Sequence, residues 1–171
     1  MSKLFLMMRY TSVHGKSYWA NHHLNEKTKY ISRDEIRFSM LKDEDDYFAK
    51  EKEVFKEFCK QIDIALQTYD NVIADATHLN FASRNKTLRN IKNKIDEINV
   101  IFIDTPLEIA LERNAKRTGR KLVPEEVIKN MYSSLMLPDE LEGISKIYIV
   151  DNATQKIKIR TCGSRSIQYI D

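Results

Sequence analysis

The chain has 171 residues, of which 42% are hydrophobic, and 28 basic against 25 acidic residues give a net charge of +3. This composition excludes an intrinsically disordered chain, and two cysteines are too few for a disulfide scaffold. No apolar run reaches the roughly 18 residues that a membrane span requires. We therefore expect one globular domain over residues 1–171, without membrane contact, in a reducing cytoplasm with both cysteines free.

Short apolar segments alternate with helix-forming segments from the start of the chain. An apolar run predicts a strand over 3–8, and it is too short to be the core of a signal peptide. A loop then leads to a predicted helix over 16–24, and a short strand is expected over 29–31. Ser32 begins the next helix, with Glu35 three residues later completing a capping box.

Longer elements are predicted in the middle of the chain. Hydrophobic residues at helical spacing indicate an amphipathic helix over 47–69, with Phe48 and Ile64 on its apolar face. A strand of buried type over 71–75 ends in a carboxylate, and a basic helix over 81–94 follows it.

The pattern continues to the end of the chain. After a strand over 99–104, Thr105 is expected to cap a helix that has Pro106 at its first position and Glu108 in a capping box. We expect that helix to extend to about Arg117.

Two further elements and a tail complete the pattern. A helix over 124–136 precedes a strand over 146–150, and two short antiparallel strands are expected in the tail, about 155–171. Five strands that alternate with helices predict a three-layer α/β/α fold with a five-stranded parallel sheet.

The most informative motif lies directly after the first strand. A strand, a loop, Gly15-Lys16-Ser17 and a helix are typical of a P-loop, whose backbone N–H groups hold phosphates. Lys16 would contact the terminal phosphate of ATP and the Ser17 hydroxyl would bind Mg²⁺. The full pattern G-x-x-x-x-G-K-S has a glycine where this chain has Tyr10. The fold prediction is therefore of P-loop NTPase type with an altered loop. The alternative explanation of Lys16 and Ser17 is that they begin a helix on the protein surface.

Carboxylates and an arginine follow two other predicted strands. Asp34 and Arg37 are three residues apart and share a helical face, so a general base could lie beside a phosphate ligand. A surface ion pair explains the same spacing equally well. Asp75 ends a strand where a carboxylate can approach Mg²⁺ through water, although a turn or cap is the alternative.

A basic region extends over residues 84–121, with ten Lys or Arg against five Asp or Glu. Arg113 and Arg117 are four apart, and arginine donors suit a phosphoryl group in transfer. Thr118-Gly119 breaks the helix behind them, which predicts a helical lid over about 113–136. A solvated charged surface is the alternative. No aromatic platform for stacking bases is evident in the sequence.

Four blocks of sequence, in this order and spacing, resemble the kinase domain of phage-type 5′-hydroxyl polynucleotide kinases and their P-loop predicted-kinase relatives. The blocks are ISRDEIR at 31–37, DATHLN at 75–80 with Arg84, ERNAKR at 112–117, and VPEEVI at 123–128 followed by Met131-Tyr132. The resemblance covers roughly residues 3–150. It implies an ATP-dependent, Mg²⁺-requiring kinase that transfers the γ-phosphate to a 5′-hydroxyl end of DNA or RNA.

The resemblance also implies roles for individual residues. Asp34 would be the general base, acting with Lys16 and Arg117 in catalysis. The implied ATP-binding residues are Gly15, Lys16, Ser17, Arg113, Arg117 and Arg120. The implied acceptor-binding residues are Arg37, Asp75, Thr77 and Arg84, and Ser17 is the implied metal ligand.

The P-loop itself departs from the family pattern, which reads approximately G-x-P-G-S-G-K-S. Tyr10 and Val13 replace two glycines, and a valine forced to positive φ would be strained by about 1–2 kcal/mol. One hypothesis is an active kinase acting on 5′-hydroxyl ends or on a smaller acceptor. The other is an impaired P-loop module that binds nucleotide or nucleic-acid ends without chemistry. The sequence gives no indication of oligomeric state.

Overall fold

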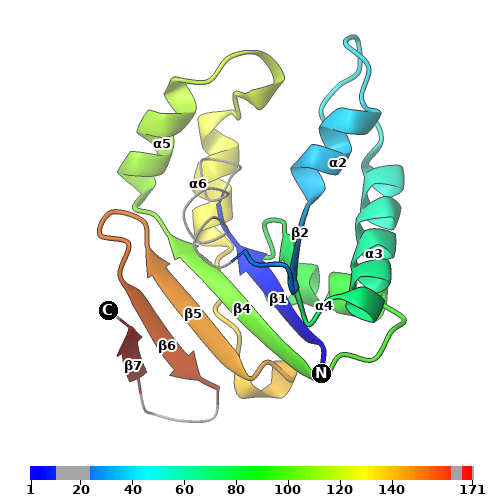
Figure 1. Ribbon diagram of the computed structural model, residues 1–171. Coiled ribbons are helices and arrows are strands. Elements are labelled where there is room, and N and C mark those ends of the chain that lie inside the picture. The colour runs from blue at the N-terminus through cyan, green and yellow to red at the C-terminus, as the bar shows by residue number, and fades with distance from the viewer. Residues whose placement is uncertain (11–23, 163–166, 171) are drawn as a thin grey trace.

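A seven-stranded sheet forms the centre of the protein, shown in Figure 1 as a computed structural model that describes residues 1–10, 24–162 and 167–170. The strands are β1 (Lys3–Met8), β2 (Thr28–Ser32), β3 (Asn71–Asp75), β4 (Glu97–Asp104), β5 (Lys146–Asp151), β6 (Ile157–Thr161) and β7 (Ile167–Ile170). Their order is β2-β3-β1-β4-β5-β6-β7. The first five strands are parallel, and β6 and β7 are antiparallel to their neighbours.

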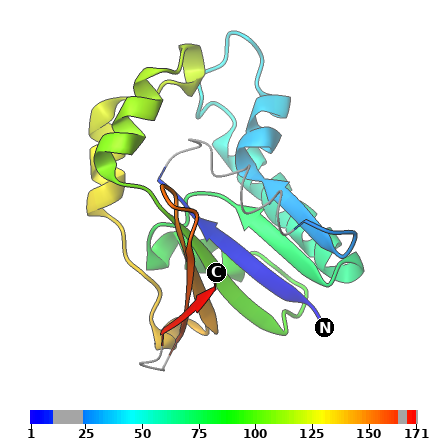
Figure 2. The same ribbon diagram turned by 60° about the vertical axis from the view of Figure 1, so that its left-hand side comes forward.

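The described helices lie beside the sheet and beyond the ends of its parallel strands. They are α2 (Arg33–Met40), α3 (Glu51–Thr68), α4 (Phe81–Arg89), α5 (Leu107–Ala115) and α6 (Glu125–Ser133), with short 3-10 turns η1 (Gly119–Lys121) and η2 (Glu140–Glu142). Figures 1 and 2 show α2 and α3 on one side of these strand ends and α5 and α6 on the other.

The register of the sheet brings the strand ends together. β1 lies between β3 and β4, with Met7 opposite Asp75 and Met8 opposite Phe102. Ser32, the last residue of β2, is likewise opposite Asp75. Residues that follow β1, β2 and β3 therefore meet at one edge of the sheet, where ligands bind in open α/β folds.

The larger core cluster lies on one face of the sheet. Leu4, Leu6 and Met8 of β1 are fully buried and belong to the same cluster as Val54 and Phe58 of α3. Alternate strand residues point to the opposite face, which has a smaller cluster. Its buried members are Met7, Ile73, Ile101, Ile103, Val150 and Ile157. The packed strands form a rigid base for the side chains at their ends.

The predicted α/β fold with five parallel strands is confirmed, while several helix boundaries differ from the predictions. The helix expected over 47–69 begins only at Glu51, because residues 47–50 form a turn. Phe48 and Ile64, expected on the apolar face, are 68% and 55% exposed. The basic helix expected to reach residue 94 ends at Arg89.

The region before the predicted lid also differs from the expectation. Thr105 does not cap α5: its hydroxyl accepts a hydrogen bond from the Asn152 amide, and Pro106 occupies the cap position. The helix ends at Ala115, so Arg117 lies beyond it. The helix predicted over 16–24 falls almost entirely outside the described residues.

Two further expectations concern the chain as a whole. Cys59 is buried, Cys162 is half-buried, and neither forms a disulfide. Burial raises the pKa of the Cys59 thiol to about 11, which makes it a poor nucleophile. None of the helices in the described part of the chain is both long and apolar enough to cross a membrane.

Candidate active site

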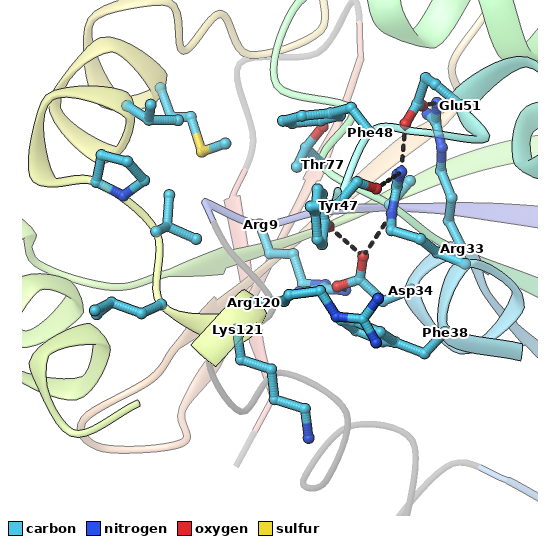
Figure 3. Close-up of a pocket in the computed structure, with 17 residues that line it drawn as sticks. Arg9, Arg33, Asp34, Phe38, Tyr47, Phe48, Glu51, Thr77, Arg120 and Lys121 are labelled. Atoms are coloured by element: carbon cyan, nitrogen blue, oxygen red, sulfur yellow. Dashed lines mark hydrogen bonds and ion pairs between the residues drawn. The ribbon is translucent and has the colours of Figure 1, made fainter. Parts of the chain in front are cut away.

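A pocket of about 410 Å³ opens at the carboxyl end of the parallel strands (Figure 3). Its base includes Arg9, Ala76 and Thr77, which follow β1 and β3. One wall comes from α2 and the segment leading into α3, and the other from η1 and α6. The wall residues are Arg33, Asp34, Arg37, Phe38, Tyr47, Phe48 and Glu51 on the first side, and Arg120, Lys121, Leu122, Val123, Pro124, Val127 and Met131 on the second.

Asp34 is the carboxylate that this arrangement presents to the pocket. The Ser32 hydroxyl accepts a hydrogen bond from the Glu35 N–H and caps α2, so Asp34 lies in the first helical turn beside the strand ends. The Tyr47 hydroxyl donates to Asp34 Oδ1 over 2.6 Å. Arg9 Nη2 lies 3.6 Å from Oδ2, and the Asp34 side chain retains one fifth of its exposure. The carboxylate is thus oriented by partners yet open to a ligand.

Arg9 joins this carboxylate to a second one below it. The guanidinium Nε donates to Asp75, which is 1% exposed and also accepts the Tyr30 hydroxyl. Burial disfavours the positive charge of Arg9, but Asp75 and Asp34 outweigh this effect and raise its pKa. Burial and the neighbouring Asp75 also raise the pKa of Tyr30, which keeps its hydroxyl protonated as a donor.

Arg37 is fixed in a buried ion cluster beside Asp34. Its Nη1 donates to Glu51 and to the Tyr47 carbonyl, and the guanidinium lies 4.3 Å from the centre of the Tyr47 ring. Arg33 also donates to Glu51. Burial opposes ionisation of Glu51, but Arg37 and Arg33 prevail and lower its pKa. Arg37 Nε lies 3.7 Å from Asp34 Oδ1 and has no hydrogen-bond partner among the described residues.

Three aromatic side chains gather around Asp34, although they come from two separate segments. Phe38 of α2 and Phe48 both make edge contacts with Tyr47, at ring-centre distances of 6.0 and 4.8 Å. Burial raises the pKa of Tyr47 to about 12, as does the adjacent Asp34 carboxylate. Tyr47 therefore remains a hydrogen-bond donor at neutral pH. These rings give the pocket an aromatic wall beside its ionic base.

The opposite wall is connected to the first by Arg120. From η1, its Nη1 donates to the carbonyls of Lys42 and Asp45 over 2.7 and 3.1 Å. Arg117 Nη1 donates to the Lys121 carbonyl over 3.3 Å. Burial and the positive charge of Arg9 lower the pKa of Arg117, whereas Asp34 raises it. Arg117 is not among the residues that line the pocket.

Not all of the predicted site residues meet in this pocket. Asp34, Arg37, Thr77 and Arg120 line it, and Asp75 supports it from below through Arg9. Arg113 is half-buried on α5 and is not among the lining residues. Gly15, Lys16 and Ser17 lie outside the described residues.

Arg84 is placed away from the pocket, in the interior. Its side chain is 1% exposed and forms a two-point ion pair with Glu142 at 2.7 and 2.8 Å. Nη1 also donates to the carbonyls of His78 and Met136. These contacts hold the segment after α6 against α4, so Arg84 acts structurally in this geometry instead of contacting an acceptor.

The loop that carries Asp75 and Thr77 is held by His78. This histidine has a φ of 43° and is 2% exposed, a conformation that its surroundings must enforce. Nδ1 lies 3.1 Å from the Met7 carbonyl and must donate to it, while Nε2 faces the Thr87 hydroxyl at 2.9 Å. Burial lowers the pKa of His78 to about 4, so the ring is neutral.

Tyr10, which stands where the P-loop pattern has a glycine, is packed into the core. It is 5% exposed and stacks on Tyr132 of α6, with ring centres 3.6 Å apart. Phe102 of β4 meets its edge at 6.0 Å. Its side chain is absent from the pocket lining, so its bulk is directed toward α6.

Sequence reasoning missed Arg9, Tyr47 and Phe48. Arg9 had a readable signal, because it is a charged residue directly after a buried strand, as Asp75 is. Tyr47 and Phe48 had none, since their spacing fitted the apolar face of a helix that begins four residues later. The base partner and the aromatic wall could be found only from the fold.

Comparison with known proteins gives the family. A family model described as AAA domain matches residues 7–138, and none of the curated proteins matches the sequence. A chain in the structure of the Pnkp1/Rnl/Hen1 RNA repair complex is similar with a TM-score of 0.65 and 24% identity. The match covers 78% of this chain but 44% of that one, so this chain spans less than half of that relative's length.

Two further solved structures are similar over most of their length. A sugar kinase from Janibacter sp. HTCC2649 matches with a TM-score of 0.55 and 18% identity, over 88% of this chain and 85% of that one. A fungal RNA kinase matches with a TM-score of 0.53 and 13% identity, over 88% and 74%. At these identities the likeness shows a shared fold. With three quarters of its length matched by one family model, the chain belongs to the AAA domain family, and it shares the α/β fold of these solved structures.

Proposed function

We propose that the protein is an ATP-dependent kinase of polynucleotide type, which transfers the γ-phosphate of ATP to a 5′-hydroxyl end of DNA or RNA. The observation that carries this proposal is the setting of Asp34. Its carboxylate is open to the pocket, receives the Tyr47 hydroxyl and lies between two arginines. Such a group is suited to accept the proton of an attacking hydroxyl.

The residues around the pocket fit a polyphosphate substrate. Arg120 and Lys121 line the wall opposite Asp34, and Arg117 donates a hydrogen bond to the Lys121 carbonyl behind that wall. Guanidinium groups match phosphate oxygens in charge and geometry. We assign Arg117 and Arg120 to the phosphates of ATP, with residues 113–136 as a lid over them. Arg113, on the same segment, completes this set when the lid moves.

Mg²⁺ would be held mainly through the phosphates of ATP instead of through a cluster of protein side chains. No cluster of three or more His, Cys, Asp or Glu able to hold a metal occurs among the described residues. Asp75, the carboxylate that the sequence suggested could approach Mg²⁺ through water, already accepts hydrogen bonds from Arg9 and Tyr30. Proteins commonly hold Mg²⁺ through few side chains together with substrate phosphates, so we propose that it would bind together with ATP. We assign Ser17 as its ligand and Gly15 and Lys16 to the phosphates; bound Mg·ATP supplies the phosphoryl group.

Proton transfer in the proposed reaction involves Asp34 Oδ2, because Oδ1 is occupied by Tyr47. The acceptor hydroxyl oxygen forms a bond to the γ-phosphorus while the bond from that phosphorus to the bridging oxygen breaks, releasing ADP. The hydroxyl proton passes to Asp34 and then to water. We assign Arg37 and Thr77, which line the pocket, to the acceptor, where they would hold the phosphate next to the terminal sugar.

Transfer of labelled γ-phosphate to a 5′-hydroxyl oligonucleotide tests this function. Asp34→Asn should lower kcat by about 10²- to 10⁴-fold, the usual contribution of a general base, with ATP binding by calorimetry unchanged. Asp43→Asn, in the exposed loop after α2, serves as the matched control and should behave as wild type. Equal kcat for Asp34→Asn and wild type would remove the assigned base.

The departures at Tyr10 and Val13 favour one alternative, a module that binds nucleotide or nucleic-acid ends without chemistry. ATP binding without transfer to any oligonucleotide or sugar would establish that alternative. Transfer to a sugar but not to an oligonucleotide would instead identify a small-molecule kinase. Absence of ATP binding even at millimolar concentration would contradict both kinase hypotheses.

A further inference from the structure

Three of the residues that line the pocket, Phe48, Leu122 and Val127, form what we call the apolar slot, which the proposed phosphotransfer chemistry does not use. Phe48 is 68% exposed at one side of it, and Leu122 and Val127 of the facing wall are 48% and 37% exposed. Large apolar side chains exposed together are uncommon unless they meet a ligand or partner. Here they border the same pocket as Asp34 (Figure 3).

Phe48 is held as a platform instead of folding into the core. Its neighbour Tyr47 meets it edge to face, with ring centres 4.8 Å apart and planes at 84°. The Arg37 guanidinium lies 5.7 Å from the centre of the Phe48 ring. Because Tyr47 also binds Asp34 and contacts Arg37, the ring position is tied to that of the proposed base.

The charge of the pocket restricts what can occupy the slot. Among the described residues, its lining has five cationic side chains and two anionic ones. The cations are Arg9, Arg33, Arg37, Arg120 and Lys121, and the anions are Asp34 and Glu51. A ligand complementary to this pocket carries negative charge and presents a flat apolar face. A nucleotide unit has both features, whereas a sugar needs many hydrogen-bonding partners that an apolar slot does not provide.

We infer that Phe48 stacks on the base of the nucleotide that carries the acceptor hydroxyl, with Leu122 and Val127 covering the other face of that base. This inference rests on the proposed kinase function and deepens it. Phe48, Leu122 and Val127 have hydrocarbon side chains, which have no group that could form a hydrogen bond with the edge of a base. The site therefore accepts any base and requires only that a base be present.

The experiment compares Phe48→Ala with Phe81→Ala. Phe81 is 51% exposed at the start of α4 and is not among the pocket-lining residues, so it is the matched control. Phe48→Ala should raise KM for a 5′-hydroxyl oligonucleotide by about 5- to 150-fold, the effect of removing a stacked aromatic. KM for ATP should not change. Phe48→Trp should keep the wild-type KM, and Phe48→Leu should not, because leucine is apolar without a stacking face.

The second part of the experiment uses an acceptor oligonucleotide whose terminal nucleotide lacks its base. Wild type should bind it at least as weakly as Phe48→Ala binds the complete oligonucleotide. Loss of the base should cost Phe48→Ala less than it costs wild type, because only the contacts with Leu122 and Val127 remain to be lost. Any base at the terminus should give a similar KM. A Phe48→Ala KM equal to that of Phe81→Ala would overturn the inference. A loss on the abasic acceptor as large in Phe48→Ala as in wild type would also overturn it.

Binding measured without catalysis separates this inference from the proposed function. Fluorescence anisotropy with a 3′-labelled 5′-hydroxyl oligonucleotide should show the same dependence on Phe48 and on the terminal base. Binding that depends on Phe48 in a protein that transfers no phosphate would retain the stacking site and reject the kinase. Transfer that is indifferent to Phe48 would retain the kinase and reject the stacking site.

Discussion

Replacing Arg9 by methionine should destabilise the protein strongly, because Arg9 neutralises a carboxylate that water cannot reach. Asp75 is 1% exposed, and its partners are the Arg9 guanidinium and the Tyr30 hydroxyl. Methionine preserves most of the side-chain volume but removes the charge. Breaking a buried ion pair from one side costs about 3–5 kcal/mol. Tyr30 remains as a donor, so we expect the lower end, and a Tm lower by roughly 6–12 °C.

Urea denaturation followed by circular dichroism measures this loss, and a second substitution identifies its source. Asp75→Asn added to Arg9→Met removes the unpaired charge while keeping an acceptor for Tyr30. The double variant should therefore be more stable than Arg9→Met alone. Lys3→Met is the control, since the Lys3–Glu97 pair spans 3.3 Å at the surface and should contribute less than about 1 kcal/mol.

Two results would refute the reasoning. A loss for Arg9→Met no larger than that for Lys3→Met would mean that the buried pair does not stabilise the fold. A double variant with the summed loss of both single variants would mean that the two side chains act independently.

Three further outcomes follow from the site and its supports. Between pH 6.5 and 4 the free energy of unfolding should fall by up to about 3 kcal/mol on account of His78, which stays neutral when folded but gains a proton when unfolded. His78→Gln should flatten that part of a urea-midpoint profile. Arg84→Met should cost about 3 kcal/mol by orphaning Glu142, with acceptor KM unchanged; a raised KM would restore a direct binding role. Arg120→Ala should speed amide hydrogen exchange in residues 42–46, and unchanged exchange would show that this contact does not hold the walls together.

The sheet was predictable because each parallel strand is a short apolar run with a clear end. The stretch NVIAD and the apolar run at the N-terminus matched the observed strands β3 and β1 residue for residue. Helix ends were harder to predict, because capping depends on contacts with residues that are distant in the sequence. Thr105 reads as a cap from its neighbours, yet its hydroxyl is taken by Asn152, 47 residues away.

Some residues of the pocket could be predicted from the sequence and others could not. Asp34 was identifiable from a capped helix after a strand, and the structure places it in the pocket with Arg37. The family resemblance implied that Arg84 binds the acceptor, and its burial against Glu142 could not be predicted because that partner lies 58 residues away in the sequence. The aromatic wall could not be predicted because Tyr47 and Phe48 lie in the turn before α3. No local sequence pattern distinguishes that turn from the first turn of a helix.

The stack of Tyr10 on Tyr132 makes the altered P-loop difficult to reverse. Restoring glycine at position 10 would match the family pattern, but it would leave a void between Phe102 and α6. Removing an aromatic side chain from such a site typically costs about 3–5 kcal/mol. A glycine at position 10 would therefore need a compensating change in α6 to keep the protein stable. Positions 10 and 132 are coupled through packing although more than a hundred residues separate them in the sequence.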